Sequence, residues 1–441
     1  MKSRFLTCTA LMTLIAVLVL PLRPAAQNIP AHPTRHHYKL IDLGRFGGPQ
    51  SWVFGAQEAP AATLSTAGVV GGADTADSNP NYPNFSPLMG VGGLFGYAGP
   101  FINHAFKGDK GGLIDLGVLP GGYNSFAQWI STNGTIVGAS ENGAIDPITA
   151  WPVVHAVLWP KNGHSIIDLG TLPGAYESTA LAVNNLNQVV GAAIDAAGNG
   201  RGFWWTKKKG LQDIGTLGGC CAIATLVNDL GQVAGASGAC DSCNQDSFFW
   251  EKGHMTPIPD FGGPLSFPDS LNNSGQVVGQ SDLPGGGTAH AFLWEKGILT
   301  DLGTLPGGDG SSARWINEAG DIVGLSQAGM IYHAVLWKRQ GKHFKITDLG
   351  TIDPCSIAQS INLEGQIVGE SENCDGIPRH AFLWENGGPI VDLNTVIPPN
   401  SGLTLILAVT INDRGEIAGQ ATDADGNNHA FLLIPRENGV K

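Results

Sequence analysis

Short apolar segments recur along this chain, separated by turns rich in Gly, Pro and Asn. The stretch from Gly297 to Trp337 shows the pattern in compact form. Its four segments cover residues 298–302, 312–317, 321–324 and 333–337. Short apolar runs bounded by such turn residues are typical of β-strands. We name these strands d, a, b and c in chain order.

This four-strand unit is repeated. Its clearest mark is a Gly-x-Val/Ile-Val/Ala-Gly phrase, whose closing glycines are Gly71, Gly138, Gly191, Gly235, Gly279, Gly324, Gly369 and Gly419. From Gly191 to Gly369 the intervals are 44, 44, 45 and 45 residues, and the longer intervals elsewhere indicate loop insertions. A period near 45 made only of strands predicts the blades of a β-propeller.

A four-residue turn joins strands a and b in most units. Asn317-Glu318-Ala319-Gly320 is one example, and Asn also opens the turns at Asn228, Asn272, Asn362 and Asn412. Asn in the first position bonds the backbone two residues on, and Gly in the last position tolerates a left-handed conformation. Strands a and b are therefore predicted to form a tight hairpin.

The two ends of the repeat region are complementary. Residues 38–43 resemble a strand d that lacks a preceding a, b and c, whereas the last unit stops after its strand c at residues 429–433. If the first strand completes the last blade, no edge strand remains unpaired. The prediction is a single all-β domain, residues 38–441, that forms an eight-bladed propeller of four-stranded blades closed by the N-terminal strand.

The first 26 residues have the features of a secretory signal. Lys2 and Arg4 precede an apolar run over residues 11–20, and Pro24-Ala25-Ala26 provides small residues for cleavage before Gln27. A permanent membrane anchor is the alternative, although the run is short for a membrane span. We expect a signal peptide over residues 1–26, a linker over 27–37 and a protein that is secreted or periplasmic.

Composition limits the partners. Charged residues are 14% of the chain, and the formal charge of −13 becomes −16 when Lys2, Arg4 and Arg23 are removed with the signal. An acidic protein repels nucleic acid and anionic membranes. We expect no nucleic-acid partner, no stable membrane span and a monomer.

Six units carry His at the start of strand c, namely His104, His155, His290, His333, His380 and His429. Arg201 and Asp246 occupy the matching positions in the other two units. A residue that recurs in six blades is interpreted as a structural hydrogen-bonding group. The recurring Trp series, such as Trp294 and Trp337, is interpreted as packing between blades.

These phrases carry a family resemblance. His-Ala-Phe-Leu-Trp at 290–294 and 380–384, with Asp-Leu-Gly-Thr-Leu-Pro-Gly-Gly at 301–308 and Gly-Gln-Val-Val-Gly at 275–279, resembles the HAF repeat of probable bacterial extracellular repeat proteins. The resemblance extends over residues 38–433. It implies an exported repeat protein whose biochemical function is undetermined, without catalytic residues to transfer.

Six cysteines follow the signal segment. Cys221 and Cys240 are 19 residues apart, as are Cys355 and Cys374, and both pairs flank strands a and b of a blade. We predict the disulfides Cys221–Cys240 and Cys355–Cys374, with Cys220–Cys243 as a third pair. The alternatives for the first group are a zinc site of Cys220, Cys221, Cys240 and Cys243, or a Cys-x-x-Cys redox centre at 240–243.

Function in repeat proteins most often lies where the repeat is interrupted. The first unit inserts residues 73–102 between strands b and c, and the second has a smaller insertion at the same place. The hypothetical ligand-binding residues in these two loops are Tyr82, Phe85, Phe95, Tyr97, Glu141, Asp146 and Trp151. An insertion that binds nothing is the alternative interpretation.

The loops also differ in charge. The b–c loops are rich in Asp and Glu, whereas the c–d loops are rich in Lys, so an acidic and a basic face are predicted on opposite sides of the propeller. Residues 423–427, Asp-Ala-Asp-Gly-Asn, suggest a calcium loop, but an Asp/Gly turn is the simpler interpretation. No metal or other cofactor is assigned.

Three functions are compatible with this sequence. The leading hypothesis is a secreted binding module that holds a glycan, peptide or protein on the acidic loop face. The second is a glycoside hydrolase or polysaccharide lyase with catalytic carboxylates among Glu141, Asp146, Glu177 and Asp309, although no catalytic motif is present. The third is a structural cell-envelope protein without a small ligand.

Overall fold

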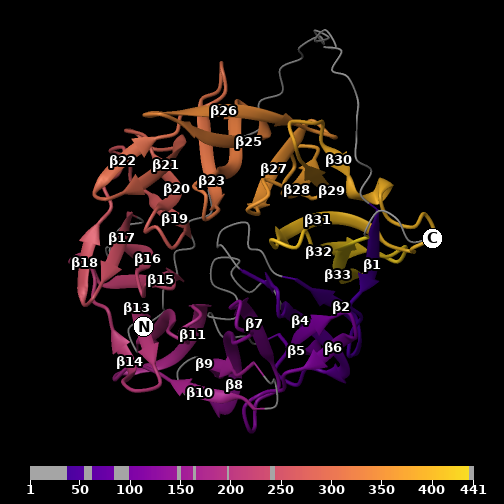
Figure 1. Cartoon of the computed structure of the whole chain (residues 1–441). Helices are drawn as coiled ribbons and strands as arrows, with labels where there is room; N and C mark the ends of the chain where they lie inside the picture. Colours follow the sequence, from indigo (N-terminus) through magenta and orange to yellow (C-terminus); the bar gives the residue numbers. More distant parts are fainter. Residues whose placement is uncertain are drawn as a thin grey trace. The chain divides into compact units, whose positions relative to one another are not determined.

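The computed structural model describes residues 37–53, 62–83, 99–146, 150–161, 165–195, 198–238 and 244–436. The chain divides into two compact units, Met1–Arg35 and His36–Lys441, and all described residues belong to the second. They form β-strands and a short 3-10 helix, η3 (Leu393–Thr395), with the strands in eight antiparallel sheets around a ring (Figure 1). The predicted eight-bladed propeller is confirmed.

The blades are numbered in chain order, with strands a to d running from the axis outward. Blade 1 contains β2 (Gly47–Trp52) and β3 (Leu64–Ser65) on its inner side, β4 (Gly68–Ser78), β5 (Phe101–Asp109) and β6 (Gly112–Asp115). Blade 2 contains β7 (Ser125–Ile130), β8 (Ile136–Ile145), β9 (Pro152–Trp159) and β10 (Ile167–Gly170). Blade 3 contains β11 (Ala175–Val183), β12 (Val189–Asp195), β13 (Gly200–Thr206) and β14 (Gly210–Asp213). Blade 4 contains β15 (Cys221–Val227), β16 (Val233–Gly238), β17 (Gln245–Glu251) and β18 (His254–Pro257).

The second half of the ring follows the same order. Blade 5 contains β19 (Ser266–Leu271), β20 (Val277–Asp282), β21 (Ala289–Glu295) and β22 (Ile298–Asp301). Blade 6 contains β23 (Gly310–Ile316), β24 (Ile322–Ala328), β25 (Ile331–Gln340) and β26 (His343–Gly350). Blade 7 contains β27 (Cys355–Ile361), β28 (Ile367–Glu372), β29 (His380–Trp384) and β30 (Val391–Asp392). Blade 8 contains β31 (Thr404–Ile411), β32 (Ile417–Thr422), β33 (Asn428–Pro435) and β1 (Tyr38–Asp42).

Blade 8 is closed by the N-terminal strand, as predicted. β1 pairs antiparallel with β33, so that Tyr38 lies opposite Pro435 and Asp42 opposite Phe431. This pairing gives β33 a second neighbour and leaves it no open edge. The antiparallel order also places a–b and c–d turns on one face of the ring, and b–c and d–a connections on the other.

The hydrophobic core lies between neighbouring blades. One cluster joins Val278 and Leu293 of blade 5 to Ile322 and Trp337 of blade 6. Trp159 of blade 2 is fully buried, and its indole N–H donates to the carbonyl of Leu116 in blade 1 at 2.8 Å. The repeated tryptophans therefore pack blade against blade, as the sequence indicated.

The repeated glycine of strand b is required by a bulge in strand a. In blade 6 the register shifts between Ala313 and Trp315, and a Cβ added to Gly324 would overlap the carbonyl oxygen of Ser312. The same bulge occurs in blades 2 to 8, at Gln128, Leu181, Thr225, Asp269, Arg314, Gln359 and Val409. A bulge re-aims the side chain of its extra residue, which here belongs to the innermost strand.

Hydrogen bonds link the a–b turns in series from blade 3 around the axis to blade 1. Asn272 accepts the N–H groups of Ser274 and Gln276 at 3.0 and 3.1 Å, as predicted for a turn residue. Its amide also donates to the carbonyl of Asn317 in the next blade at 3.1 Å. Equivalent amide links in the same direction join Asn184, Asn228, Asn272, Asn317, Asn362, Asn412 and finally Ser65. We call this series the asparagine ring.

The repeated His joins strand c to strand d within its blade. His290 Nδ1 lies 2.9 Å from Asp301 Oδ2, while Asp301 Oδ1 accepts the N–H of Gly303. The other five His residues make the same contact, with Asp115, Asp168, Asp348, Asp392 and Asp42. In blade 3 the Arg201 Nε donates to Asp213 instead. The recurring contact supports the structural interpretation of the repeated His.

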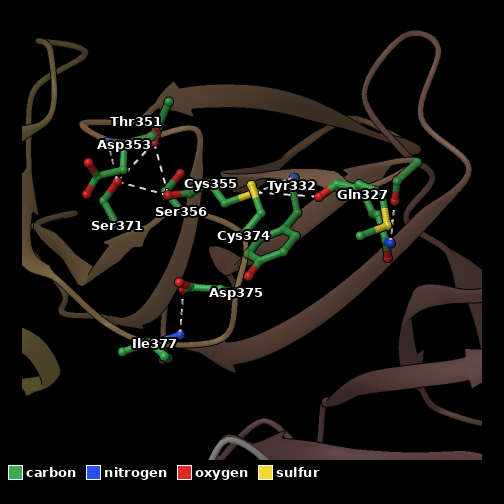
Figure 2. Close-up of a disulfide and its surroundings, with 12 residues drawn as sticks. Gln327, Tyr332, Thr351, Asp353, Cys355, Ser356, Ser371, Cys374, Asp375 and Ile377 are labelled. Carbon is green, nitrogen blue, oxygen red and sulfur yellow. Dashed lines mark hydrogen bonds between the residues drawn. A yellow bond between two sulfur atoms is a disulfide. The ribbon is translucent and has the colours of Figure 1, made fainter. Parts of the chain in front are cut away.

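The disulfide Cys355–Cys374 is present, with the two Cα atoms 5.1 Å apart. Figure 2 shows this bond beside Tyr332, whose backbone N–H lies 3.3 Å from Cys355 Sγ. The predicted Cys221–Cys240 bond is wrong, because Cys221 has a free thiol and Cys220 is the disulfide-bonded residue. Adjacent side chains of an extended chain point in opposite directions, so equivalence between blades did not identify the bonded one. Cys240 and Cys243 lie outside the described residues, and Cys220–Cys243 stays a prediction.

Candidate functional site

The predicted ligand-binding residues of the first insertion are only partly described. Phe85, Phe95 and Tyr97 lie outside the described residues. Tyr82 is 51% exposed at the start of the insertion. The neighbouring Asn79 donates its backbone N–H to the carbonyl of Pro100, which brings the two ends of the loop together. The two ends of the insertion are therefore hydrogen-bonded to each other where it leaves β4 and returns to β5.

Glu141 connects this insertion to blade 2. Its side chain is buried, and its carboxylate accepts from the Asn124 amide at 2.8 Å and from the backbone N–H groups of Tyr123 and Asn124. It also accepts from the Asn81 amide at 3.3 Å. Glu141 thus positions the loop before β7 and the base of the insertion at the same time.

The remaining predicted residues lie in the b–c loop of blade 2. The backbone N–H of Asp146 donates to the carbonyl of Trp151, so these two residues lie side by side at the base of the loop. Asp146 is buried and Trp151 is half-buried. Asp146 belongs to the acidic surroundings of Tyr176 in blade 3. Burial raises the pKa of Tyr176, and the charges of Glu177, Asp146 and Asp195 raise it further.

The structure therefore joins the b–c connections of blades 1 and 2 and places that of blade 2 within electrostatic range of the start of β11 in blade 3. Asn81 of blade 1 bonds Glu141 of blade 2, and Asp146 of blade 2 lies in the electrostatic environment of Tyr176 in blade 3. This region, which we call the acidic b–c site, contains exposed or half-buried aromatic rings together with carboxylates. Aromatic faces and carboxylate oxygens are the groups that stack on sugar rings and accept hydrogen bonds from their hydroxyls.

The carboxylates considered for catalysis do not act as one group. Asp146 and Glu177 both lie close enough to raise the pKa of Tyr176, whereas Glu141 uses its oxygens in positioning loops. Asp309 directly precedes β23 of blade 6 and accepts the N–H of Gly329. Figure 1 shows β23 across the ring from β8 of blade 2. The four residues are not brought together into one acid and base pair.

The loop at 423–427 is a hydrogen-bonded turn. Asp423 Oδ1 accepts the N–H groups of Asp425 and Asn427, and Oδ2 accepts from the Asn427 amide. These bonds hold the pKa of Asp423 well below its usual range. Asp195 closes the equivalent turn of blade 3 through Asn199 in the same way. Across the described part of the chain, no cluster of three or more His, Cys, Asp or Glu side chains could hold a metal ion.

A second polar cluster was missed from the sequence. Arg314 in the bulge of blade 6 lies 3.9 Å from Asp269 in the bulge of blade 5, and Gln359 in the bulge of blade 7 donates to Glu370 at 3.1 Å. Burial raises the pKa of Asp269 to about 7, and the Arg314 charge opposes this shift. Burial likewise raises the pKa of Glu370 to about 7, against the Gln359 hydrogen bond and the Arg314 charge.

The signal for this cluster was variation within the repeat. In blades 2 to 8 the position three residues before the turn Asn or Ser changes from blade to blade, whereas the residue before it is Ala in every blade except blade 5, which has Pro268. That variability becomes meaningful only when the bulge is known, because an unbulged strand would alternate its side chains regularly.

Comparisons with known proteins bear on the fold alone. No family model matches the chain, and no curated protein matches it. Among solved structures, the Dos1 propeller is similar over 87% of this chain and 95% of its own, with 10% identity and a TM-score of 0.45. The propeller domain of the Trilobed protease from Pyrococcus furiosus covers 89% of this chain and 100% of its own, with 8% identity and a TM-score of 0.42. TolB from Acinetobacter baumannii matches over 69% of this chain but only 64% of its own length, with 12% identity and a TM-score of 0.33.

Within the residues that the structure describes, no helix has the length and apolar character needed to cross a membrane. The class that the fold defines is therefore an eight-bladed β-propeller with a disulfide in blade 7.

Proposed function

We propose that this chain is an exported propeller that binds a carbohydrate, or a peptide or protein segment, at the acidic b–c site of blades 1 to 3. The observation that carries the proposal is the buried Glu141, which ties the base of the unrepeated insertion to blade 2. A loop that served only as decoration would not need a buried carboxylate at its base, because burying a charge is costly unless it is well bonded.

Among these ligand classes, a carbohydrate suits the site best. Tyr82 and Trp151 expose ring surface, and Asp146 and Asp195 add carboxylate oxygens nearby. Sugar rings present one apolar face and several hydroxyl donors, which matches such a combination. A basic peptide is the second ligand that an acidic face attracts.

Export is part of the proposal. Residues 1–26 have the pattern of a signal peptide, and the HAF-repeat resemblance implies an extracellular repeat protein. The disulfide Cys355–Cys374 is consistent with an oxidising compartment, outside the cell or in the periplasm.

The test replaces the insertion and leaves the blade intact. Because β4 ends at Ser78 and β5 begins at Phe101, residues 79–100 can be replaced by Asn-Gly, which favours a tight hairpin. A glycan array identifies the ligand on the intact protein, and calorimetry then measures its affinity for both proteins. We expect the shortened protein to lose binding and to keep its melting temperature.

Two controls make the result specific. Shortening the connection Leu283–Thr288 of blade 5 removes a b–c loop of the same face and should leave binding unchanged. Release of reducing ends from an array-positive glycan would instead identify a glycan-cleaving enzyme, and its dependence on Asp146 or Glu177 would locate the chemistry. Unchanged binding after removal of residues 79–100 would contradict the proposed site.

A further inference from the structure

A cavity of about 280 Å³ lies at the mouth of the central channel on the a–b turn face, opposite the acidic b–c site. It is lined by the a–b turns of all eight blades, so it lies on the axis of the ring. Its volume equals that of roughly nine water molecules in the liquid. The cavity therefore suits a compact organic molecule.

The rim of this cavity is formed by the residue that follows each Asn of the asparagine ring, or Ser in blades 1 and 2. In blade order the rim residues are Thr66, Thr132, Asn185, Asp229, Asn273, Glu318, Leu363 and Asp413. The three carboxylates come from blades 4, 6 and 8, so they are spread around the rim. None of the described residues that line the cavity is basic.

These carboxylates are held in place by the preceding blade. Asp229 accepts from the backbone and the side-chain amide of Asn185, both at 2.9 Å. Glu318 accepts from Asn273 in the same manner, and Asp413 accepts the N–H of Leu363 at 2.9 Å. All of these donors are neutral, and the nearby Arg414 guanidinium pairs with Glu416 and donates to the Thr66 carbonyl instead of to these three carboxylates.

The electrostatic effect is visible at Glu318. Burial raises its pKa, and although the backbone hydrogen bond from Asn273 lowers it, the charges of Asp229 and Asp413 raise it further. Asp229 and Asp413 therefore repel the Glu318 charge across the mouth of the cavity. A negative potential of this kind attracts a cation into the cavity.

The inner end of the cavity is apolar and aromatic. Trp129 and Trp315 are half-buried members of its lining, together with the buried Ile316 and Ile361. The Trp129 ring packs against hydrophobic clusters of blades 3, 4 and 5, so it extends across the inner strands of these blades. An indole face attracts a cation through its electron-rich surface.

We propose that this cavity binds a small organic cation, an alkylated ammonium whose apolar part lies against Trp129 and Trp315 and whose charge faces Asp229, Glu318 and Asp413. A bare metal ion does not fit this arrangement, because carboxylates from alternate blades surround the mouth without converging on one point. An anion would meet three negative charges and no basic lining residue. This site is independent of the acidic b–c site proposed above.

The experiment compares two ligands of the same shape. Choline carries a quaternary ammonium, and dimethylbutanol is its neutral carbon isostere. Calorimetric titration of the full-length mature protein should show choline binding at least about tenfold more tightly than dimethylbutanol. Raising the salt concentration should weaken choline binding and leave dimethylbutanol binding unchanged.

The rim is tested by the triple variant Asp229→Asn, Glu318→Gln and Asp413→Asn. Each amide oxygen can still accept a hydrogen bond from the preceding blade, although at Asp229, where both oxygens accept from Asn185, one of the two bonds is lost. We expect choline affinity to fall about tenfold, to the level of dimethylbutanol. The matched control, Asp109→Asn with Asp375→Asn and Asp425→Asn, removes three exposed carboxylates outside the mouth and should leave choline affinity unchanged.

A separate variant tests the aromatic end. Trp315→Leu should weaken both ligands, because both lie against the ring. Protein with residues 79–100 replaced should bind choline normally, which separates this site from the b–c site. Equal affinity for the two ligands, or undiminished choline binding by the triple rim variant, would overturn the proposal. So would the absence of binding by either ligand at tens of millimolar.

Discussion

The asparagine ring predicts a stability cost that a simple turn would not have. Asn272 is buried and makes four side-chain hydrogen bonds, two accepted within its own turn and two donated, to Gln276 and to Asn317 of the next blade. A buried hydrogen bond contributes about 1 kcal/mol net. Asn272→Ala should therefore lower the free energy of unfolding by about 4 kcal/mol.

Asn272→Ser separates the two roles of this residue. Blades 1 and 2 use Ser naturally, and Ser131 and Ser65 still accept a turn N–H through their hydroxyls. The Ser variant keeps one accepted turn bond and loses the second together with both donated bonds, including the link to Asn317. We expect a loss of about 3 kcal/mol, smaller than that for Ala by about one hydrogen bond.

Equilibrium unfolding in guanidinium chloride, followed by tryptophan fluorescence, measures both variants. The exposed Asn400, changed to Ser, is the control for the substitution itself and should have no effect. If Asn272→Ser were as stable as the unmodified protein while Asn272→Ala was destabilised, the inter-blade link would contribute nothing and Asn272 would be a turn residue only.

Three further predictions concern the bonds within and between blades. Replacing Cys355 and Cys374 by Ser should lower the free energy of unfolding by about 3 kcal/mol, because the bond closes a loop of about twenty residues; equal denaturation midpoints for the two proteins would contradict this. The hydrogen bond with the Asp348 side chain raises the pKa of His333 above 6.5, so this pair stabilises fully below that pH and loses its contribution as pH rises through the raised pKa. Between pH ~6 and ~8 the melting temperature should therefore decrease less with rising pH for His333→Asn than for the unmodified protein. An equal decrease in both proteins would show that the pair does not titrate in this range. Deleting residues 27–44 removes β1 and exposes the edge of β33, which should cause aggregation by light scattering; a monomer with unchanged melting would argue against closure.

The architecture could be predicted from the sequence because each repeat unit corresponds to one four-stranded blade. The spacing of the closing glycines predicted the eight blades, and the missing strands at the two ends predicted the β1–β33 pairing. The disulfide Cys355–Cys374 followed from its position in one blade. These features can be read from spacing and order along the chain, without the three-dimensional distances between residues.

Features that depend on side-chain direction were not accessible from the sequence. The amide of Asn272 bonds to Asn317 of the next blade, but the turn motif predicts only the hydrogen bonds that Asn272 makes to its own turn. Asp269 and Arg314 meet because both blades are bulged at the same place, and a bulge leaves no unique mark in the sequence. Glu141 was predicted as a ligand-binding or catalytic acid, and only its four donors reveal that it holds two loops together.

The closure of blade 8 also sets an order of events during biosynthesis. His429 and Asp42, which bond across this closure, are 387 positions apart in the chain. The strand that leaves the ribosome first is therefore the last to find its partner, and seven blades can form while β1 has no sheet to join. Long-range pairing of this kind is slow because the chain must lose the entropy of a very large loop before the contact forms. Until β33 is available to pair with β1, the folding chain therefore keeps an open strand edge through which it can associate with other chains.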